Sequence, residues 1–302
     1  MPVHPAAPAD VTEIVAAYRQ TLTSFADVAD GLRDEDWDRP TALPGWTARD
    51  VLAHVVHIED YLSGSEHPVS GWSEPAEAVE VGTPEHVRNA FAVWNEEGVR
   101  ARDDRAPAEL VAELRGLMEV RSAIMYDADL ELDTTVRTVR GQEGPFGEVT
   151  RMRIVDVWMH EQDLRDVVDR PGSLDSPGAS QFMELVMDTL CHIVLHRVQP
   201  EPGTVVILES TGPVTARGGV RIGLDADGEP VAHELFTGHT TAEDDEPSVD
   251  DESDDRATTI SMSTYYLARR AAGRVATEDT RYQVVGDEDL ARRVLDALEI
   301  TP

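Results

Sequence analysis

The chain has 302 residues, 41% of them hydrophobic, which is enough for two domains with cores of their own. It carries 59 acidic residues against 26 basic ones, all arginine. The resulting net charge of −33 repels nucleic acid phosphates and anionic membranes, and we attribute it to a heavily hydrated surface rather than to a dedicated cationic partner. No apolar run approaches the ~18–20 residues of a membrane helix, and the first residues do not resemble a signal peptide. We therefore expect a soluble, cytoplasmic protein.

Residues 10 to about 198 repeat apolar side chains every three or four positions, as amphipathic helices do. Asp10 is placed to cap a first helix whose apolar face includes Tyr18 and Phe25. After a loop at 34–46, Thr47 and Asp50 approach a capping box and begin a second helix, which ends near Gly64. The further predicted segments, in chain order, are a connection at 65–83, a helical region at 84–127 with a break at Pro107, an extended piece within 129–148 that precedes a Gly144-Pro145 turn, and helices at 149–169 and 176–198.

Beyond Pro200 the pattern changes to short β-branched segments bounded by Gly, Pro or Asp, which is typical of strands. The predicted strands are 204–210, 220–225, 231–236, 257–263 and 281–285, with helices at 264–273 and 287–298. We therefore predict an α+β fold with a helical domain at 1–200 and a small α+β domain at 201–302. Segment 243–255, with nine acids in thirteen residues, is expected to be an exposed loop, because it lacks the spacing and the central glycine of a calcium loop.

One set of side chains suggests a metal site. Asp156 and His160 are four residues apart, so they share one face of their helix. His54 lies on the side of its own helix that carries Val51 and Val55, which we expect to face inward. Facing helices of a bundle can bring such side chains together. Two imidazoles and one carboxylate leave a coordination position for water or substrate, which is typical of a reactive zinc.

The spacing alone leaves the choice of ligands open. His192 and His196 have the same four-residue separation and lie beside Cys191, and His57 follows His54 by one helical turn. A histidine in an apolar run is also common as a core residue. From spacing alone, a metal site is plausible and its ligands are undecided.

Two segments resemble the mycothiol-dependent maleylpyruvate isomerase family. PTALPGWTARDVLAHVVHIEDYL, at 40–62, resembles the family's first metal-binding segment, and MRIVDVWMHEQDLRDVVDRPG, at 152–172, resembles the second. GRVATEDTRYQVVGDEDLARRVLDAL, at 273–298, is similar to the family's small C-terminal domain. The resemblance implies a DinB-like bundle of the four-helix type, followed by the small α+β domain. It places the metal ligands on His54, Asp156 and His160.

The resemblance also bears on the other candidates. It gives no role to His192 or His196, which we interpret as structural, and leaves His57 as a candidate supporting residue. The family's isomerase carries Glu where this chain carries Asp156, one methylene shorter. Glu161 and Gln162 are expected either to reach the mouth of the site or to face solvent. The three tryptophans near these motifs, Trp37, Trp46 and Trp158, are expected to serve packing.

A divalent metal, expected to be zinc, held by two neutral histidines and one aspartate keeps a net charge near +1 and would lower the pKa of a coordinated water or thiol. Cys191, the single cysteine, is expected to be a buried helix residue, so a thiol nucleophile would come from outside. The resemblance implies mycothiol as that thiol. It further implies addition of the thiolate to a conjugated double bond, rotation and elimination, with Arg274 as the catalytic residue that binds a carboxylate of the diacid.

The leading hypothesis is a metal-dependent, mycothiol-using isomerase or S-transferase whose partners are a small electrophile and a low-molecular-weight thiol. Two alternatives stay open. A thiol-independent metal hydrolase would use metal-bound hydroxide, and a non-catalytic protein would bind a metal or a thiol without chemistry. No lysine is present for a phosphate-binding Gly-Lys-Thr loop, so nucleotide binding is not expected.

Overall fold

The computed structural model describes residues 8–65, 79–127, 129–236 and 257–300. The chain divides into two compact units, Pro8–Ser173 and the described residues from Leu174 on. The first is built of helices and one small hairpin, and the second contains a five-stranded sheet. The predicted α+β class is confirmed. In the described part of the chain, no helix is both long and apolar enough to span a bilayer.

The helices of the first unit begin where local hydrogen bonds favour it. Helix α1 (Val11–Asp30) is capped by Asp10, whose side chain accepts from the amide of Glu13. Helix α2 (Ala48–Leu62) begins at a capping box formed by Thr47 and Asp50. The predicted break at Pro107 separates helices α3 (Ala90–Arg100) and α4 (Pro107–Met125), and Pro107 is the first residue of α4.

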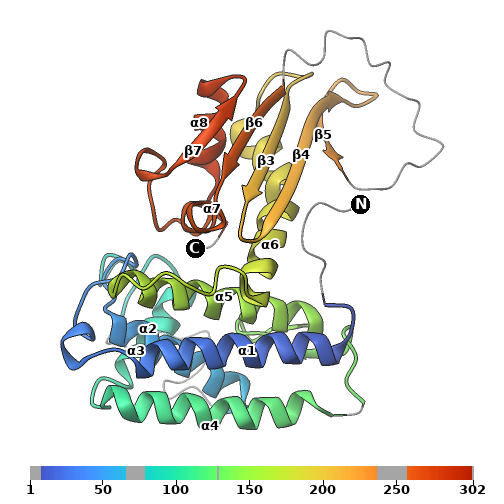
Figure 1. The fold of residues 1–302 in the computed structure, drawn as a ribbon. Helices are drawn as coiled ribbons and strands as arrows, with labels where there is room; N and C mark the ends of the chain where they lie inside the picture. The colour runs from blue at the N-terminus through green and yellow to red at the C-terminus, as the bar shows by residue number, and fades with distance from the viewer. Residues whose placement is uncertain (1–7, 66–78, 128, 237–256, 301–302) are drawn as a thin grey trace. The chain divides into compact units, whose positions relative to one another are not determined.

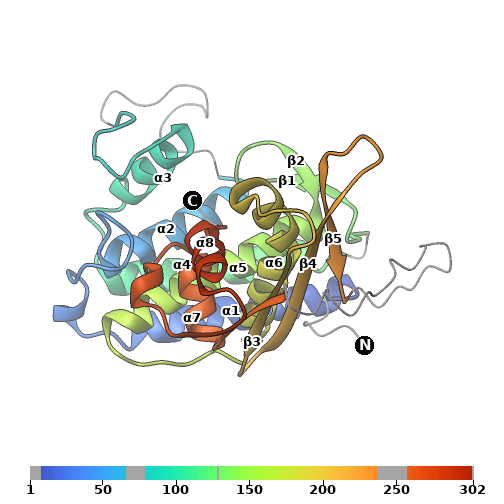
Figure 2. The same cartoon turned by 90° about the horizontal axis from the view of Figure 1, so that it is seen from above.

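Four long helices surround the core of the first unit. Helices α1 and α2 each pack against both α4 and α5 (Phe146–Val167), and α3 packs on the outer side of α2 (Figures 1 and 2). Strands β1 (Thr135–Arg137) and β2 (Glu143–Pro145) form an antiparallel hairpin before α5. Gly144 and Pro145 therefore belong to a strand, and the turn that the sequence predicted at these residues is wrong.

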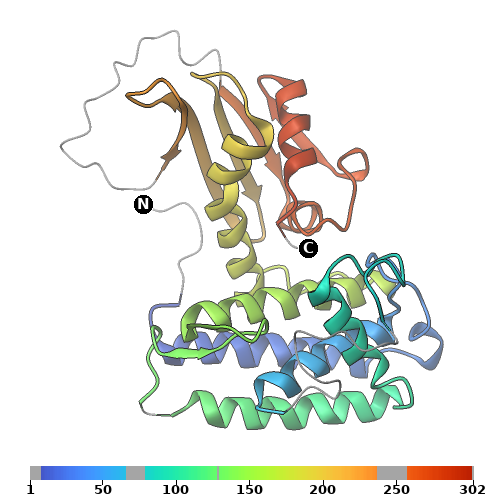
Figure 3. The same ribbon diagram turned by 180° about the vertical axis from the view of Figure 1, so that it is seen from behind.

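In the second unit, the sheet has the order β5-β4-β3-β6-β7 and is antiparallel except for the central β3–β6 pair. Helices α6 and α8 cover the same face of this sheet (Figures 1 and 3). The strands are β3 (Val205–Thr211), β4 (Thr215–Leu224), β5 (Pro230–Leu235), β6 (Ala257–Met262) and β7 (Tyr282–Val285). The helices are α6 (Pro177–Ile193), a π-helical turn at Val194–Val198, α7 (Thr264–Ala271) and α8 (Glu288–Ala297).

Strand β4 begins five residues earlier than the sequence predicts. Its first half contains Gly218 and Gly219, which are poor strand formers but allow a neighbouring helix to approach the sheet closely. A Cβ at Gly218 would lie 3.0 Å from the sulfur of Met187 on α6. The same helix, which the sequence assigned to the first domain, belongs to the second compact unit. The domain boundary predicted at residue 200 stays a prediction, because compactness alone does not show which segments fold independently. The acidic segment 243–255 lies outside the described residues.

Two helical glycines provide a test of the packing around α2. A Cβ at Gly98 of α3 would lie 2.3 Å from the ring of His57, whereas a Cβ at Gly116 of α4 would meet no atom within 4 Å. We expect Gly98→Ala to lower the free energy of unfolding by about 1–3 kcal/mol through overpacking. Gly116→Ala should raise it by about 0.5–1 kcal/mol through helix propensity. Urea denaturation measures both changes, and equal effects would contradict the close contact at Gly98.

Candidate metal centre

The candidate site lies between α2 and α5. Helix α5 carries Arg153, Asp156, His160 and Asp163 at steps of three, four and three residues, so all four lie along one stripe of the helix. Helix α2 contributes His54 from a stretch in which every residue from Val51 to Glu59 is buried. Because α2 packs against α5, the stripe and His54 meet inside the bundle.

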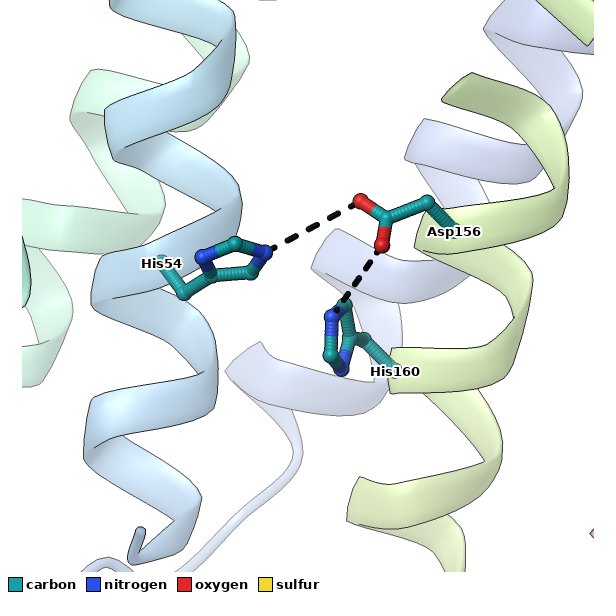
Figure 4. A group of neighbouring side chains, drawn as sticks. All are labelled: His54, Asp156 and His160. Carbon is teal, nitrogen blue, oxygen red and sulfur yellow. Dashed lines mark ion pairs between the residues drawn. The ribbon is translucent and has the colours of Figure 1, made fainter. Parts of the chain in front are cut away.

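The structure brings the three predicted residues together (Figure 4). His160 Nε2 lies 3.4 Å from Asp156 Oδ1, and His54 Nε2 lies 3.9 Å from Asp156 Oδ2. The ring centroids of the two histidines are 4.9 Å apart. One possible ligand atom from each residue lies within 4.8 Å of the others, and no second group of three or more such residues occurs in the described ranges.

Burial and charge distinguish these side chains from surface carboxylates. The side chains of His54 and His160 are 7% and 5% exposed, whereas that of Asp156 is 41% exposed. The partial burial of the Asp156 carboxyl raises its pKa, but His160, Arg153 and His54 outweigh this effect and hold that pKa well below its ordinary value. Burial lowers the pKa of His160, while Asp156 and Asp163 raise it to a net value above the usual one.

Both imidazoles are held by neighbours. His160 Nδ1 lies 3.2 Å from the buried carboxylate of Asp163, an acceptor that favours a proton on Nδ1 and leaves Nε2 to face Asp156. The ring of His54 packs against Trp46, with centroids 5.0 Å apart. The Trp46 indole donates to Glu96 Oε2, at 2.9 Å. The contacts on His160 and His54 therefore restrict the rotation of both rings.

Glu96 connects this part of the site to α3 and to the segment before it. Its carboxylate also lies 2.9 Å from His86 Nε2 and accepts from Arg100 Nε at 3.1 Å. Burial raises the pKa of Glu96, but the hydrogen bonds from His86 and Trp46 outweigh it and lower the net pKa. Trp46, which the sequence predicts to serve packing, is thus held beside His54 by the ionised carboxylate of Glu96.

The donor set and its spacing fit a divalent metal such as zinc. Zinc takes imidazole nitrogen and carboxylate oxygen at ~2.0–2.2 Å, which places tetrahedral ligand atoms ~3.3 Å apart. The 3.4 Å distance between His160 Nε2 and Asp156 Oδ1 matches that edge. His54 Nε2 lies 3.9 Å from the other oxygen of the same carboxylate, and one ligand atom from each of the three residues lies within 4.8 Å of the others. Three protein ligands leave a tetrahedral position for another molecule.

Comparison with known proteins identifies the domain family of the segment that carries these residues. Residues 18–165 match the family model of the mycothiol maleylpyruvate isomerase N-terminal domain. Residues 18–165 belong to this domain family. Two crystal structures of mycothiol-dependent maleylpyruvate isomerase, one of them a histidine-to-alanine mutant, are similar to the chain, with TM-scores of 0.52 and 0.51. Both are 16% identical to it and cover 90% of this chain and 92% of theirs, which shows the shared fold. The comparison with curated proteins found no match.

The segment matched by the family model contains all three candidate ligands and His57, whereas the alternative histidine pair, Arg274 and Cys191 belong to the second unit. His192 and His196 are exposed in the second unit, with ring centroids 4.7 Å apart. Arg274 follows α7 in the same unit and donates to the carbonyl of Ala272 at 2.8 Å. Cys191 is only partly buried, less than the sequence predicted.

The prediction for Glu161 and Gln162 is wrong, because both are buried away from solvent. Glu161 accepts from Ser24 and from Arg165, and Gln162 donates to the carbonyl of Gly172. Arg153, Asp163 and Glu59 are not among the residues predicted from the sequence. Arg153 and Asp163 could have been found from their place on the stripe of Asp156 and His160.

The raised pKa of His160 predicts how the metal-free protein responds to pH. A raised pKa means that the imidazolium pairs with Asp156 and Asp163 in the folded state, so its stabilisation is complete below the unfolded pKa of ~6.5. This stabilisation is lost as the pH rises through the folded pKa. We expect His160→Gln to destabilise the chelator-treated protein more at pH 5.5 than at pH 8.5, as measured by urea denaturation. An equal loss at both pH values would contradict the ion pair.

Proposed function

We propose that this chain is a metal-dependent enzyme that uses mycothiol, either as an isomerase or as an S-transferase. The observation that carries the proposal is the convergence of His54, Asp156 and His160 inside a domain of the maleylpyruvate isomerase family. The two histidines would supply neutral nitrogen ligands and Asp156 an oxygen ligand, with zinc the ion best suited to this set. A divalent ion bound there would lower the pKa of a thiol or water in the remaining position.

The chain's own thiol does not suit the role of nucleophile. Burial and, to a lesser degree, the charge of Glu234 raise the pKa of Cys191, so the thiol stays protonated near neutral pH. A low-molecular-weight thiol from solution would therefore be the nucleophile, and mycothiol is named in the two similar structures. Exposure of Asp156 leaves the candidate site accessible to such a molecule from its carboxylate side.

The substrate class follows from the same family. Maleylpyruvate, after which the two similar proteins are named, carries a conjugated double bond that a thiolate can attack, and carboxylates that an arginine can bind. We assign Arg274 to a carboxylate of the substrate. Because the identity to these structures is only 16%, the proposal includes thiol transfer to other electrophiles beside isomerisation.

The metal content of purified protein tests the ligands. We expect about one zinc per chain in the wild type and its loss in His54→Ala and His160→Ala, because each removal leaves two protein ligands. His192→Ala and His196→Ala remove a histidine pair of the same spacing and serve as matched controls that keep the metal. Full zinc in His54→Ala and His160→Ala, measured by elemental analysis, would refute the site.

Dependence on thiol tests the reaction. Zinc-loaded protein is expected to convert maleylpyruvate, or to couple a model electrophile to mycothiol, only when mycothiol is added. Arg274→Met should raise KM for an acidic substrate about tenfold or more through loss of a charged hydrogen bond. Turnover without thiol would favour a hydrolase, and stoichiometric binding without turnover would favour a binding protein.

A further inference from the structure

A buried arginine lies directly behind the candidate metal centre. The side chain of Arg153 is 2% exposed, and its guanidinium donates to three acceptors. These are Glu59 Oε1 at 2.6 Å, the carbonyl of Val55 at 3.0 Å, and Asp156 Oδ2. A charged group buried to this degree requires such partners, because water is not there to solvate it. Arg153 is therefore fixed on α5 by the neighbouring turn of α2.

Glu59, the main partner of Arg153, is held in turn from two other helices. It is fully buried, and the hydroxyl of Tyr18 on α1 donates to its Oε2 at 2.5 Å. Arg121 Nε on α4 lies 3.6 Å from the same oxygen. All four long helices thus contribute to this cluster, and the position of Arg153 is determined by the core of the bundle.

Asp156 contrasts with its neighbour. Its side chain is 41% exposed, so solvent alone would leave the carboxylate free to rotate. Arg153 binds Oδ2 from the buried side, and this leaves Oδ1 at 3.4 Å from His160 Nε2. That separation is close to the ~3.3 Å between two tetrahedral zinc ligands. The contact therefore orients one carboxylate oxygen for the metal and occupies the other.

We propose that Arg153, held by Glu59, is a positioning residue that orients Asp156 and thereby sets the metal affinity of the centre. This inference rests on the metal site of the proposed function. Arg153 alone would repel a divalent cation, so the negative charge of Glu59 is needed to offset it. Glu59 contacts none of the three ligands, yet it becomes a determinant of metal binding. Outer residues of this kind typically change metal affinity 10- to 100-fold.

Zinc titration against a competing chelator, with metal-free protein, tests the proposal. We expect Arg153→Lys to weaken zinc binding about 10- to 100-fold, because an ammonium cannot bind Glu59 and Asp156 together as a planar guanidinium does. Glu59→Gln keeps the shape and an acceptor but removes the charge, and should weaken binding by a similar factor. Thermal unfolding of the metal-free protein shows whether Arg153→Lys folds. If it does not, Glu59→Gln still tests the proposal.

Arg102→Lys is the matched control. Arg102 is also buried, and it also binds two carboxylates and one carbonyl, from Asp60, Glu113 and Gly98. It contacts neither Glu59 nor Asp156 through any of these bonds. We expect the zinc affinity of Arg102→Lys to stay within about twofold of the wild type, because only residues that hold a metal ligand in place are expected to change the affinity 10- to 100-fold.

Cobalt substitution gives a second readout. Visible absorption of cobalt(II) weakens as its coordination number rises, and Arg153→Lys frees Asp156 Oδ2 to join the ion. A weaker spectrum in Arg153→Lys, with an unchanged one in Arg102→Lys, would support the positioning role. Wild-type zinc affinity in both Arg153→Lys and Glu59→Gln would overturn it, as would an equal loss in Arg102→Lys. Failure of the wild type to bind zinc would instead overturn the proposed function itself.

Discussion

The ion pair between Glu59 and Arg153 is the constraint on which the candidate site depends. Both side chains are buried, and an unpaired charge at either position would be strongly destabilising. The pair fixes α2 against α5 in one register, since a shift of one turn, ~5.4 Å, would separate the charges. Glu59 follows His54 by five residues, and Arg153 precedes Asp156 by three. The register that satisfies the charges therefore also sets His54 opposite the other two candidate ligands.

The parts of this structure that depend on neighbours in sequence could be predicted. Asp10 and the Thr47–Asp50 capping box form hydrogen bonds within one turn, so the starts of α1 and α2 are readable from a few residues. The shared face of Asp156 and His160 follows from a four-residue step. The choice of His54 over the pair at 192 and 196 required the family resemblance, because spacing treats them alike.

The remaining features depend on partners distant in the chain. Glu59 and Arg153 are 94 residues apart, and nothing near either of them signals the pairing. Glu161 was expected to reach the site mouth or solvent, yet its partners include Ser24, 137 residues away. In a chain with 59 acidic residues, any one Asp or Glu is predicted from the sequence to be exposed to solvent. Only the fold identifies the few that are buried against arginine or serine.

Because acidic residues are so abundant, a specific metal site in this protein must differ from the surface carboxylates in the type of its ligands. Exposed carboxylates attract hydrated cations of every kind, but without nitrogen ligands they favour hard ions such as magnesium and calcium. The candidate centre offers two buried imidazoles and one carboxylate, a set that favours zinc among the cations the surface attracts. Arg153 strengthens this distinction, because it occupies the second oxygen of Asp156, which a hard ion such as calcium would otherwise take as a bidentate ligand. One carboxylate oxygen beside two buried imidazoles thus sets this site apart from the many surface carboxylates of a chain whose net charge is −33.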